Sequence, residues 1–191
     1  MRLRMLALAL LLAGCGASSH KTRTVRVPDA SMSPAYARGN LAVVDLDAYA
    51  HAAPRRGDVV LFHEPQGAAL GRCGDPAEPA DGHPCSRPSG GPVYPRARML
   101  RVAAVGGDWI EVRRNRVYLA RSGRGPFRRQ SEPFAKLGRC FPPLCNLPKP
   151  MRVGDGSYFL VGDKRTGSDD SRHWGPVPLQ WIDGKVTGTE T

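Results

Sequence analysis

The chain has 191 residues and a formal net charge of +11, and it contains 22 glycines and 18 prolines. This length predicts one domain, and the glycine and proline content favours turns and short strands over long helices. The charge raises the question of a nucleic-acid partner. However, the Lys and Arg residues are scattered through turns and form no basic helix, so we expect no nucleic acid and consider a surface near anionic lipid a better fit.

The N-terminus has the pattern of an export signal. A basic start at Met1–Arg4 precedes an apolar run of nine residues at Met5–Ala13, which is too short for a membrane span of roughly 20 residues. The run leads into Leu12-Ala13-Gly14-Cys15, which looks like a bacterial lipobox with Cys15 as the lipidated residue; an ordinary secretory signal with an incidental Cys is the alternative. We therefore expect an exported protein anchored by lipid at the extracytoplasmic face of the bacterial cell membrane. The expected parts are a signal peptide over 1–14, a lipidated tether over 15–24 and a domain over 25–191.

Four cysteines remain after Cys15, and an even number in an exported chain favours disulfides. Of the three arrangements of bonds we prefer the local one, Cys73–Cys85 and Cys140–Cys145, because both pairs lie in Pro- and Gly-rich segments where a covalent link offsets weak packing. A zinc site using His83 with the cysteines is the alternative, but the spacing matches no zinc pattern. We expect no metal and no cofactor.

Apolar and β-branched segments bounded by turn residues predict strands along the chain. A turn at Arg113–Asn115 makes a hairpin of two of them, and two loop-rich inserts, about 64–97 and 121–150, contain the cysteine pairs. No segment has the periodicity of an amphipathic helix. The predicted fold class is mainly β, with twisted antiparallel sheets. The predicted strands are Thr24–Val27, Asn40–Asp47, Gly57–His63, Arg98–Val105, Trp109–Val112, Arg116–Leu119, Ser157–Val161 and Gly184–Glu190.

Two polar segments contain the candidate chemistry. Val27–Pro34 (VPDASMSP) places Ser31 on the turn after the first strand, and Gly162–Arg172 (GDKRTGSDDSR) follows the strand that ends at Val161. Together with two further blocks they resemble the type I signal peptidases, and the resemblance covers about Val27 to Glu190 apart from the inserts. The four blocks, in order, are Ser31–Pro34, Arg56–Phe62, Arg101–Ile110 and Gly162–Pro178.

This resemblance implies an antiparallel β fold with a shallow groove, in which an extended peptide pairs with exposed strand edges. It implies that Ser31 is the nucleophile that cleaves exported proteins after small residues. In the family a neutral Lys activates the serine, and such a Lys must be buried to lose its proton at neutral pH. The last block supports the serine–lysine pair in the family, although a network that only stabilises the fold would use the same residues: Asp163, Arg165, Ser168, Asp170, Ser171 and Arg172.

The chain departs from the family pattern at two positions. Leu100 occupies the position of the base, and Asp29 stands two residues before the nucleophile, where many members have a Ser that helps to bind the oxyanion and others have Gly. Arg98 is a poor base because it is always protonated. Lys164 is a speculative replacement base, and His173 titrates in a useful range.

Three functions follow from this pattern. The first is a signal-peptidase-like serine endopeptidase of the bacterial cell envelope with Ser31 as nucleophile and a base still to be identified. The second is a catalytically silent relative that binds extended peptides or exported proteins on the same fold, because Leu100 replaces the Lys. The third is a related protease outside general signal-peptide processing, for example in pilus or conjugation maturation.

Overall fold

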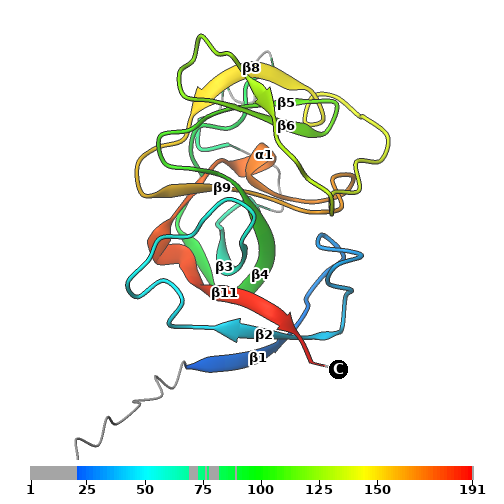
Figure 1. Ribbon diagram of the computed structural model, residues 1–191, viewed down its shortest axis with the longest axis vertical. Coiled ribbons are helices and arrows are strands. Elements are labelled where there is room, and N and C mark those ends of the chain that lie inside the picture. The colour runs from blue at the N-terminus through cyan, green and yellow to red at the C-terminus, as the bar shows by residue number, and fades with distance from the viewer. Residues whose placement is uncertain (1–20, 69–72, 76, 78–81, 89, 191) are drawn as a thin grey trace, which may run out of the picture.

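The computed structural model of the chain describes residues 21–68, 73–75, 77, 82–88 and 90–190. Predictions for the signal peptide and for Cys15 lie outside these residues. The described part is almost entirely strand and loop, with one short helix and one 3-10 turn (Figure 1). The elements in chain order are β1 (Thr22–Arg26), β2 (Leu41–Asp45), β3 (Val59–Pro65), β4 (Pro92–Val105), β5 (Trp109–Arg113), β6 (Arg116–Ala120), β7 (Arg128–Arg129), β8 (Leu147–Arg152), β9 (Ser157–Val161), α1 (Ser171–Trp174), β10 (Val177–Pro178), η2 (Leu179–Trp181) and β11 (Ile182–Thr189).

The strands form two antiparallel sheets. The large sheet has the order β1-β2-β11-β3-β4-β9-β10, and the small sheet has the order β7-β6-β5-β8. Neighbouring strands pair antiparallel in both sheets. In Figure 1 the small sheet lies at one end of the long axis, and β1 and β2 lie at the other. The predicted mainly β, antiparallel fold class is confirmed.

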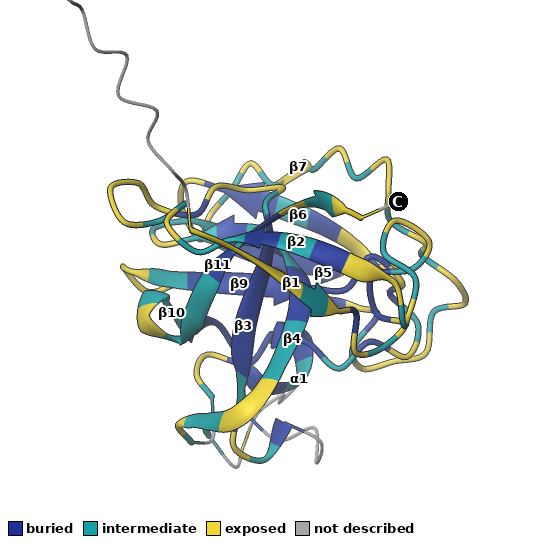
Figure 2. Ribbon diagram, turned by 90° about the horizontal axis from the view of Figure 1, so that it is seen from below, coloured by how far each residue is buried: buried dark blue, intermediate teal, exposed yellow. Residues whose placement is uncertain are grey.

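Strands β4 and β9 contribute to two hydrophobic cores, in β9 because successive side chains of a strand point to opposite faces, and in β4 because the pairing register shifts between Val102 and Ala104. Leu100 and Val102 of β4 pack in the core of the large sheet, whereas Ala104 packs in the core shared with the small sheet. On β9, Leu160 belongs to the first core and Phe159 to the second. Strand β3, dark along most of its length in Figure 2, is buried on both faces, so it shows no alternation of apolar and polar residues.

The largest differences from the predicted strands lie where proline is frequent. Strand β4 begins at Pro92, six residues before the predicted start at Arg98, and β8 lies across the end of the predicted second insert. Proline is compatible with a strand that has a neighbour on one side only, and the Pro92–Leu100 part of β4 pairs with β3 but not with β9. Strand β1 begins at Thr22, within the predicted tether, while β9 has its predicted bounds.

The predicted local disulfides are confirmed. The Cα atoms are 5.3 Å apart in Cys73–Cys85 and 5.2 Å apart in Cys140–Cys145. The first disulfide packs against the end of α1, where Cys85 Sγ lies 3.0 Å from the carbonyl oxygen of His173. The first insert is therefore attached to α1, which begins within the polar segment Gly162–Arg172.

No helix among the described residues has the length and apolar character needed to cross a membrane.

We expect Phe62→Ala to lower the free energy of unfolding by about 3–5 kcal/mol. Phe62 is 0% exposed, and its ring lies 5.9 Å, centroid to centroid, from that of Trp174. Urea denaturation measures the change. Phe141→Ala is the matched control, because Phe141 is 58% exposed, and it should cost less than about 1 kcal/mol. Equal losses in the two variants would contradict this placement of the core.

Candidate active site around Ser31

Ser31 lies on a tight turn that is fixed from both sides. Its backbone N–H donates to Oδ1 of Asp29 at 2.8 Å, which closes an Asx turn. Its carbonyl accepts a hydrogen bond of 2.8 Å from the backbone N–H of Lys164. The next residue, Met32, is 1% exposed and anchors the turn in the large core, and Ser31 itself is 5% exposed.

The guanidinium of Arg98, on β4, is the charged group that contacts the Ser31 hydroxyl. Its Nη2 donates to Ser31 Oγ at 3.4 Å. The same guanidinium pairs with three carboxylates, and this ring of charges was not predicted from the sequence. The distances are 3.1 Å to Asp29, 3.1 Å to Glu64 and 3.3 Å to Asp169.

Arg98 cannot act as a base. Burial opposes its charge, but Asp29, Asp169 and Glu64 stabilise the cation more strongly, so the pKa of Arg98 is raised above its usual value. A guanidinium has donors only. The Arg98 guanidinium therefore donates a hydrogen bond to Ser31 Oγ and cannot accept the proton of the Ser31 hydroxyl.

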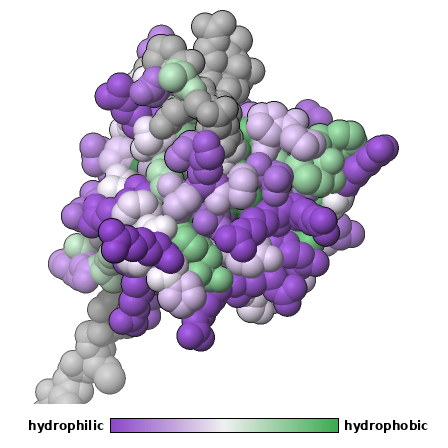
Figure 3. All heavy atoms as spheres, turned by 90° about the horizontal axis from the view of Figure 1, so that it is seen from above, coloured by the Kyte–Doolittle hydropathy of each residue, from purple (hydrophilic) through white to green (hydrophobic). Residues whose placement is uncertain are grey.

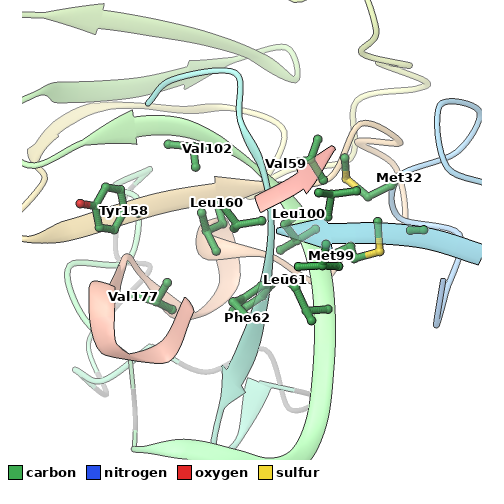
Figure 4. Packing of buried hydrophobic residues seen from close by; sticks show 14 of the residues in the cluster. Met32, Val59, Leu61, Phe62, Met99, Leu100, Val102, Tyr158, Leu160 and Val177 are labelled. Carbon is green, nitrogen blue, oxygen red and sulfur yellow. The ribbon is translucent and has the colours of Figure 1, made fainter. Parts of the chain in front are cut away.

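Leu100 is fully buried in the core of the large sheet, among Val59, Leu61 and Leu160 (Figure 4). Strand β4 pairs with β9 through Arg101 opposite Val161.

Gly162 is the point at which the two polar segments of the sequence meet. A Cβ atom at Gly162 would lie 2.2 Å from Ser168 Oγ and 2.9 Å from the carbonyl oxygen of Ser31. Ser168 and the carbonyl of Ser31 therefore pack against Gly162, and only glycine leaves room for them. Ser168 Oγ is buried and has no hydrogen-bond partner among the described residues.

Neither predicted replacement base reaches the Ser31 hydroxyl through a hydrogen bond in the described part of the chain. The side chain of Lys164 is exposed and lies with Ser33 and Lys136 along a surface hollow, so it lacks the desolvation that a neutral Lys requires. Burial lowers the pKa of His173, and its Nδ1 accepts from the backbone N–H of Asp170 at 3.5 Å.

Five of the six polar side chains singled out in the last block form hydrogen bonds or ion pairs, with Asp170 at their centre, whereas the Ser168 hydroxyl forms none among the described residues. Asp170 is 0% exposed and caps α1. Its carboxylate accepts from Arg172 Nε and Nη2, both at 2.8 Å, and from the backbone N–H of Gly162 at 3.0 Å. Burial opposes ionisation of Asp170, but Arg172 outweighs it, so the pKa of Asp170 is lowered. Ser171 Oγ accepts from the backbone N–H of Leu160 at 2.9 Å.

Asp163 and Arg165 connect this block to the small sheet and the second insert. Arg101 donates to both oxygens of Asp163, at 2.8 and 2.7 Å. Arg165 donates to the carbonyl of Asn115 at 2.7 Å and pairs with Glu132. The sequence suggested a turn at Asn115 but no role in this network, and nothing in the second insert singled out Glu132.

The fold and the site define a mainly β protein in which a serine is presented on a turn beside a strand edge and tied to a buried network of ion pairs. Among the described residues, no group of three or more His, Cys, Asp or Glu residues is arranged to bind a metal ion. A family model described as "Signal peptidase, peptidase S26" matches residues 2–189. The chain belongs to this signal peptidase family.

Individual relatives agree with this assignment. "Probable signal peptidase I-1" of Synechocystis is 31% identical over 163 residues, which cover 83% of this chain and 65% of that protein. "Thylakoidal processing peptidase 1, chloroplastic" of Arabidopsis thaliana is 28% identical over 159 residues, which cover 83% of this chain and 39% of that protein. The chain thus spans less than two thirds of the length of these curated relatives.

A solved structure of a signal peptidase I from Enterococcus faecalis is also similar to this chain. The identity is 22% and the TM-score 0.41, with 71% of this chain and 97% of that chain covered.

We expect Asp169→Asn to change the pH dependence of stability. Burial raises the pKa of Asp169 from 3.8 to about 6, although Arg98 opposes the shift. Between these values the folded chain binds more protons than the unfolded chain, so the contribution of this group is complete below about pH 4 and is lost as the pH rises through about 6. The unfolding free energy of the variant, minus that of the wild type, should therefore increase over this range.

Urea denaturation at several pH values between 4 and 7 makes this measurement. Asp155→Asn is the control, because that side chain is 80% exposed. A difference between Asp169→Asn and the wild type that stays constant with pH would contradict the assignment.

Proposed function

We propose that this chain is a signal-peptidase-like protein that binds extended segments of exported proteins beside Ser31 without cleaving them efficiently. The observation that carries the proposal is the environment of the Ser31 hydroxyl, whose contact is the guanidinium of Arg98 at 3.4 Å. Leu100, fully buried, stands where family members have the Lys base.

The free edge of β4 supports the binding part of the proposal. Pro92–Leu100 pairs with β3 on one side and has no strand partner on the other side among the described residues. An unpaired edge offers backbone N–H and C=O groups to which an extended peptide adds as a further strand. Arg98 joins this edge to Ser31, so a peptide bound along it would pass the serine.

The lack of a base beside Ser31 among the described residues supports the other part of the proposal, that the chain does not cleave the bound peptide efficiently. A serine hydroxyl is a weak nucleophile unless a base accepts its proton, and loss of the activating group in a serine protease costs about 10⁶ in kcat. Arg98 provides a donor where an acceptor is needed.

Asp29 supports the same conclusion. Acyl transfer needs N–H donors aimed at the position of the oxyanion. The Ser31 backbone N–H is a natural donor of this kind, but it already binds the Asp29 carboxylate at 2.8 Å. The negative charge of Asp29 would also repel an oxyanion.

An endopeptidase that cleaves exported proteins after small residues is the second candidate. It is favoured by the turn that presents Ser31 at the expected place, and by the cation of Arg98, which would attract a developing oxyanion. For both candidates we propose the same location, the extracytoplasmic surface of a membrane, to which lipidated Cys15 anchors the chain. Exported peptides are the proposed partners in both cases.

The two candidates differ in the behaviour of the wild-type chain. We expect the full-length protein to bind a peptide with small side chains beside the bond to be cleaved, with no turnover above that of Ser31→Ala. Fluorescence anisotropy measures binding, and mass spectrometry of the peptide measures cleavage. Cleavage by the wild type that disappears in Ser31→Ala would overturn the silent function, and absence of peptide binding in both would overturn the binding function.

We expect Leu100→Lys to introduce cleavage, at about 10²–10⁴ times the wild-type rate, the usual contribution of general base catalysis. Position 100 is fully buried, so a Lys there would be desolvated and partly neutral.

Leu100→Met is the matched control for this experiment, because it keeps the volume and supplies no base. It should fold and remain silent. Urea denaturation of all variants verifies folding, and addition of Ser31→Ala to Leu100→Lys should abolish any cleavage. If the folded Leu100→Lys variant cleaves the peptide no faster than Leu100→Met, the absence of a Lys at position 100 does not by itself explain the lack of cleavage.

A further inference from the structure

A hollow at the hairpin end of the small sheet is lined by four arginines. Arg113 ends β5, Arg116 begins β6, Arg114 lies in the turn between them, and Arg129 belongs to β7. Together with Tyr118 and two residues of the β8 region they surround a volume of about 440 Å³. None of the described residues that line this arginine hollow is acidic.

The charge of the chain is concentrated around this sheet. Residues 106–155 contain eleven Lys and Arg against four Asp and Glu, a net charge of +7 out of the +11 of the whole chain. Each of these four carboxylates already pairs with an arginine. Among the described residues, Arg114, Arg116 and Arg129 are exposed and form no salt bridge. Figure 3, viewed from this end of the molecule, shows mostly hydrophilic side chains.

The arrangement of the arginines is unfavourable for folding alone. Arg113 and Arg116 are directly opposite each other in the β5–β6 register, and like charges at such positions are destabilising; Glu111 pairs with Arg113, but no carboxylate among the described residues pairs with Arg116. Arg114 has a φ of 49° and Asn115 a φ of 64°. Hairpin turns of this kind favour Asn-Gly, and a left-handed conformation is costly for a long side chain such as Arg.

Asn115 fixes the hairpin turn that carries Arg114. Its backbone N–H donates to the carbonyl of Cys145 at 2.6 Å, and its side chain donates to the carbonyl of Leu137 at 2.7 Å. The turn thus presents Arg114 from a fixed position, and Arg113 is oriented by stacking of its guanidinium 4.8 Å from the ring centroid of Tyr118. Preorganised cations of this kind bind anions with little loss of side-chain entropy.

We propose that the arginine hollow is a phosphate-binding site. Guanidinium groups bind phosphate oxygens in bidentate geometry, and a bound phosphate would remove the repulsion between Arg113 and Arg116. The volume is sufficient for a phosphate that belongs either to a phospholipid headgroup or to a small soluble molecule. The site is separate from Ser31, because it lies on the small sheet, at the end of the molecule opposite β1 and β2 (Figure 1).

Binding by full-length protein to two probes tests the proposal. The first is flotation with phosphatidylcholine vesicles that contain or lack phosphatidylglycerol, and the second is calorimetric titration with inorganic phosphate and pyrophosphate. Binding of phosphatidylglycerol vesicles alone assigns the site to a lipid headgroup, and binding of the soluble anions assigns it to a soluble phosphate. Failure to bind any of these probes overturns the proposal.

A pair of double variants localises the site. Arg114→Ser with Arg116→Ser should weaken binding by at least about tenfold, since each charge-assisted hydrogen bond is worth more than 1.4 kcal/mol. Arg121→Ser with Arg124→Ser removes the same charge from exposed residues outside the hollow and should have a smaller effect. Equal losses in the two double variants would overturn a localised site in favour of general attraction to the basic surface. Urea denaturation verifies that both variants fold.

Discussion

The buried ion pair between Asp170 and Arg172 is the interaction on which the site depends. Its cost of desolvation is repaid because nearly every polar atom of the pair has a partner. One carboxylate caps α1, binds the guanidinium and accepts the backbone N–H of Gly162. Gly162 in turn is the place where the turn of Ser31 and the hydroxyl of Ser168 meet. Loss of either partner would leave an uncompensated buried charge and remove the hydrogen bond that fixes Gly162 beside the turn of Ser31.

The large hydrophobic core lies beside this framework. Leu100 is fully buried in it, and a Lys at this position would be buried at a cost of several kcal/mol. Ser168 Oγ has no partner among the described residues, an uncommon state for a buried hydroxyl. At the same time Arg98 and its three carboxylates provide the electrostatics beside Ser31. Membership of the signal peptidase family and the surroundings of Ser31 are therefore separate findings, because a fold does not by itself determine the chemistry of its site.

The two ends of the molecule suggest two separate tasks. The free edge of β4 beside Ser31 suits an extended peptide, whereas the small sheet concentrates positive charge that its own carboxylates do not neutralise. The network through Asp163 and Arg165 joins the two regions, since it connects the last block to β4 and to the hairpin turn at Asn115. Packing of the small sheet is therefore also part of what positions the serine.

The sequence by itself determined the local features: the β class, the position of strand β9, the turn at Ser31 and both disulfides. These depend on residue type and short spacing, such as β-branched runs, a Ser-Met-x-Pro turn and cysteines within one loop. The assignment of Leu100 to the family's base position, made from the neighbouring residues, stays a prediction. Only the tertiary structure decided what surrounds Ser31. Glu64 and Arg98 are separated along the chain by 34 residues, and Asp169 by 71 residues from Arg98, so their meeting depends on strand order and on no local pattern.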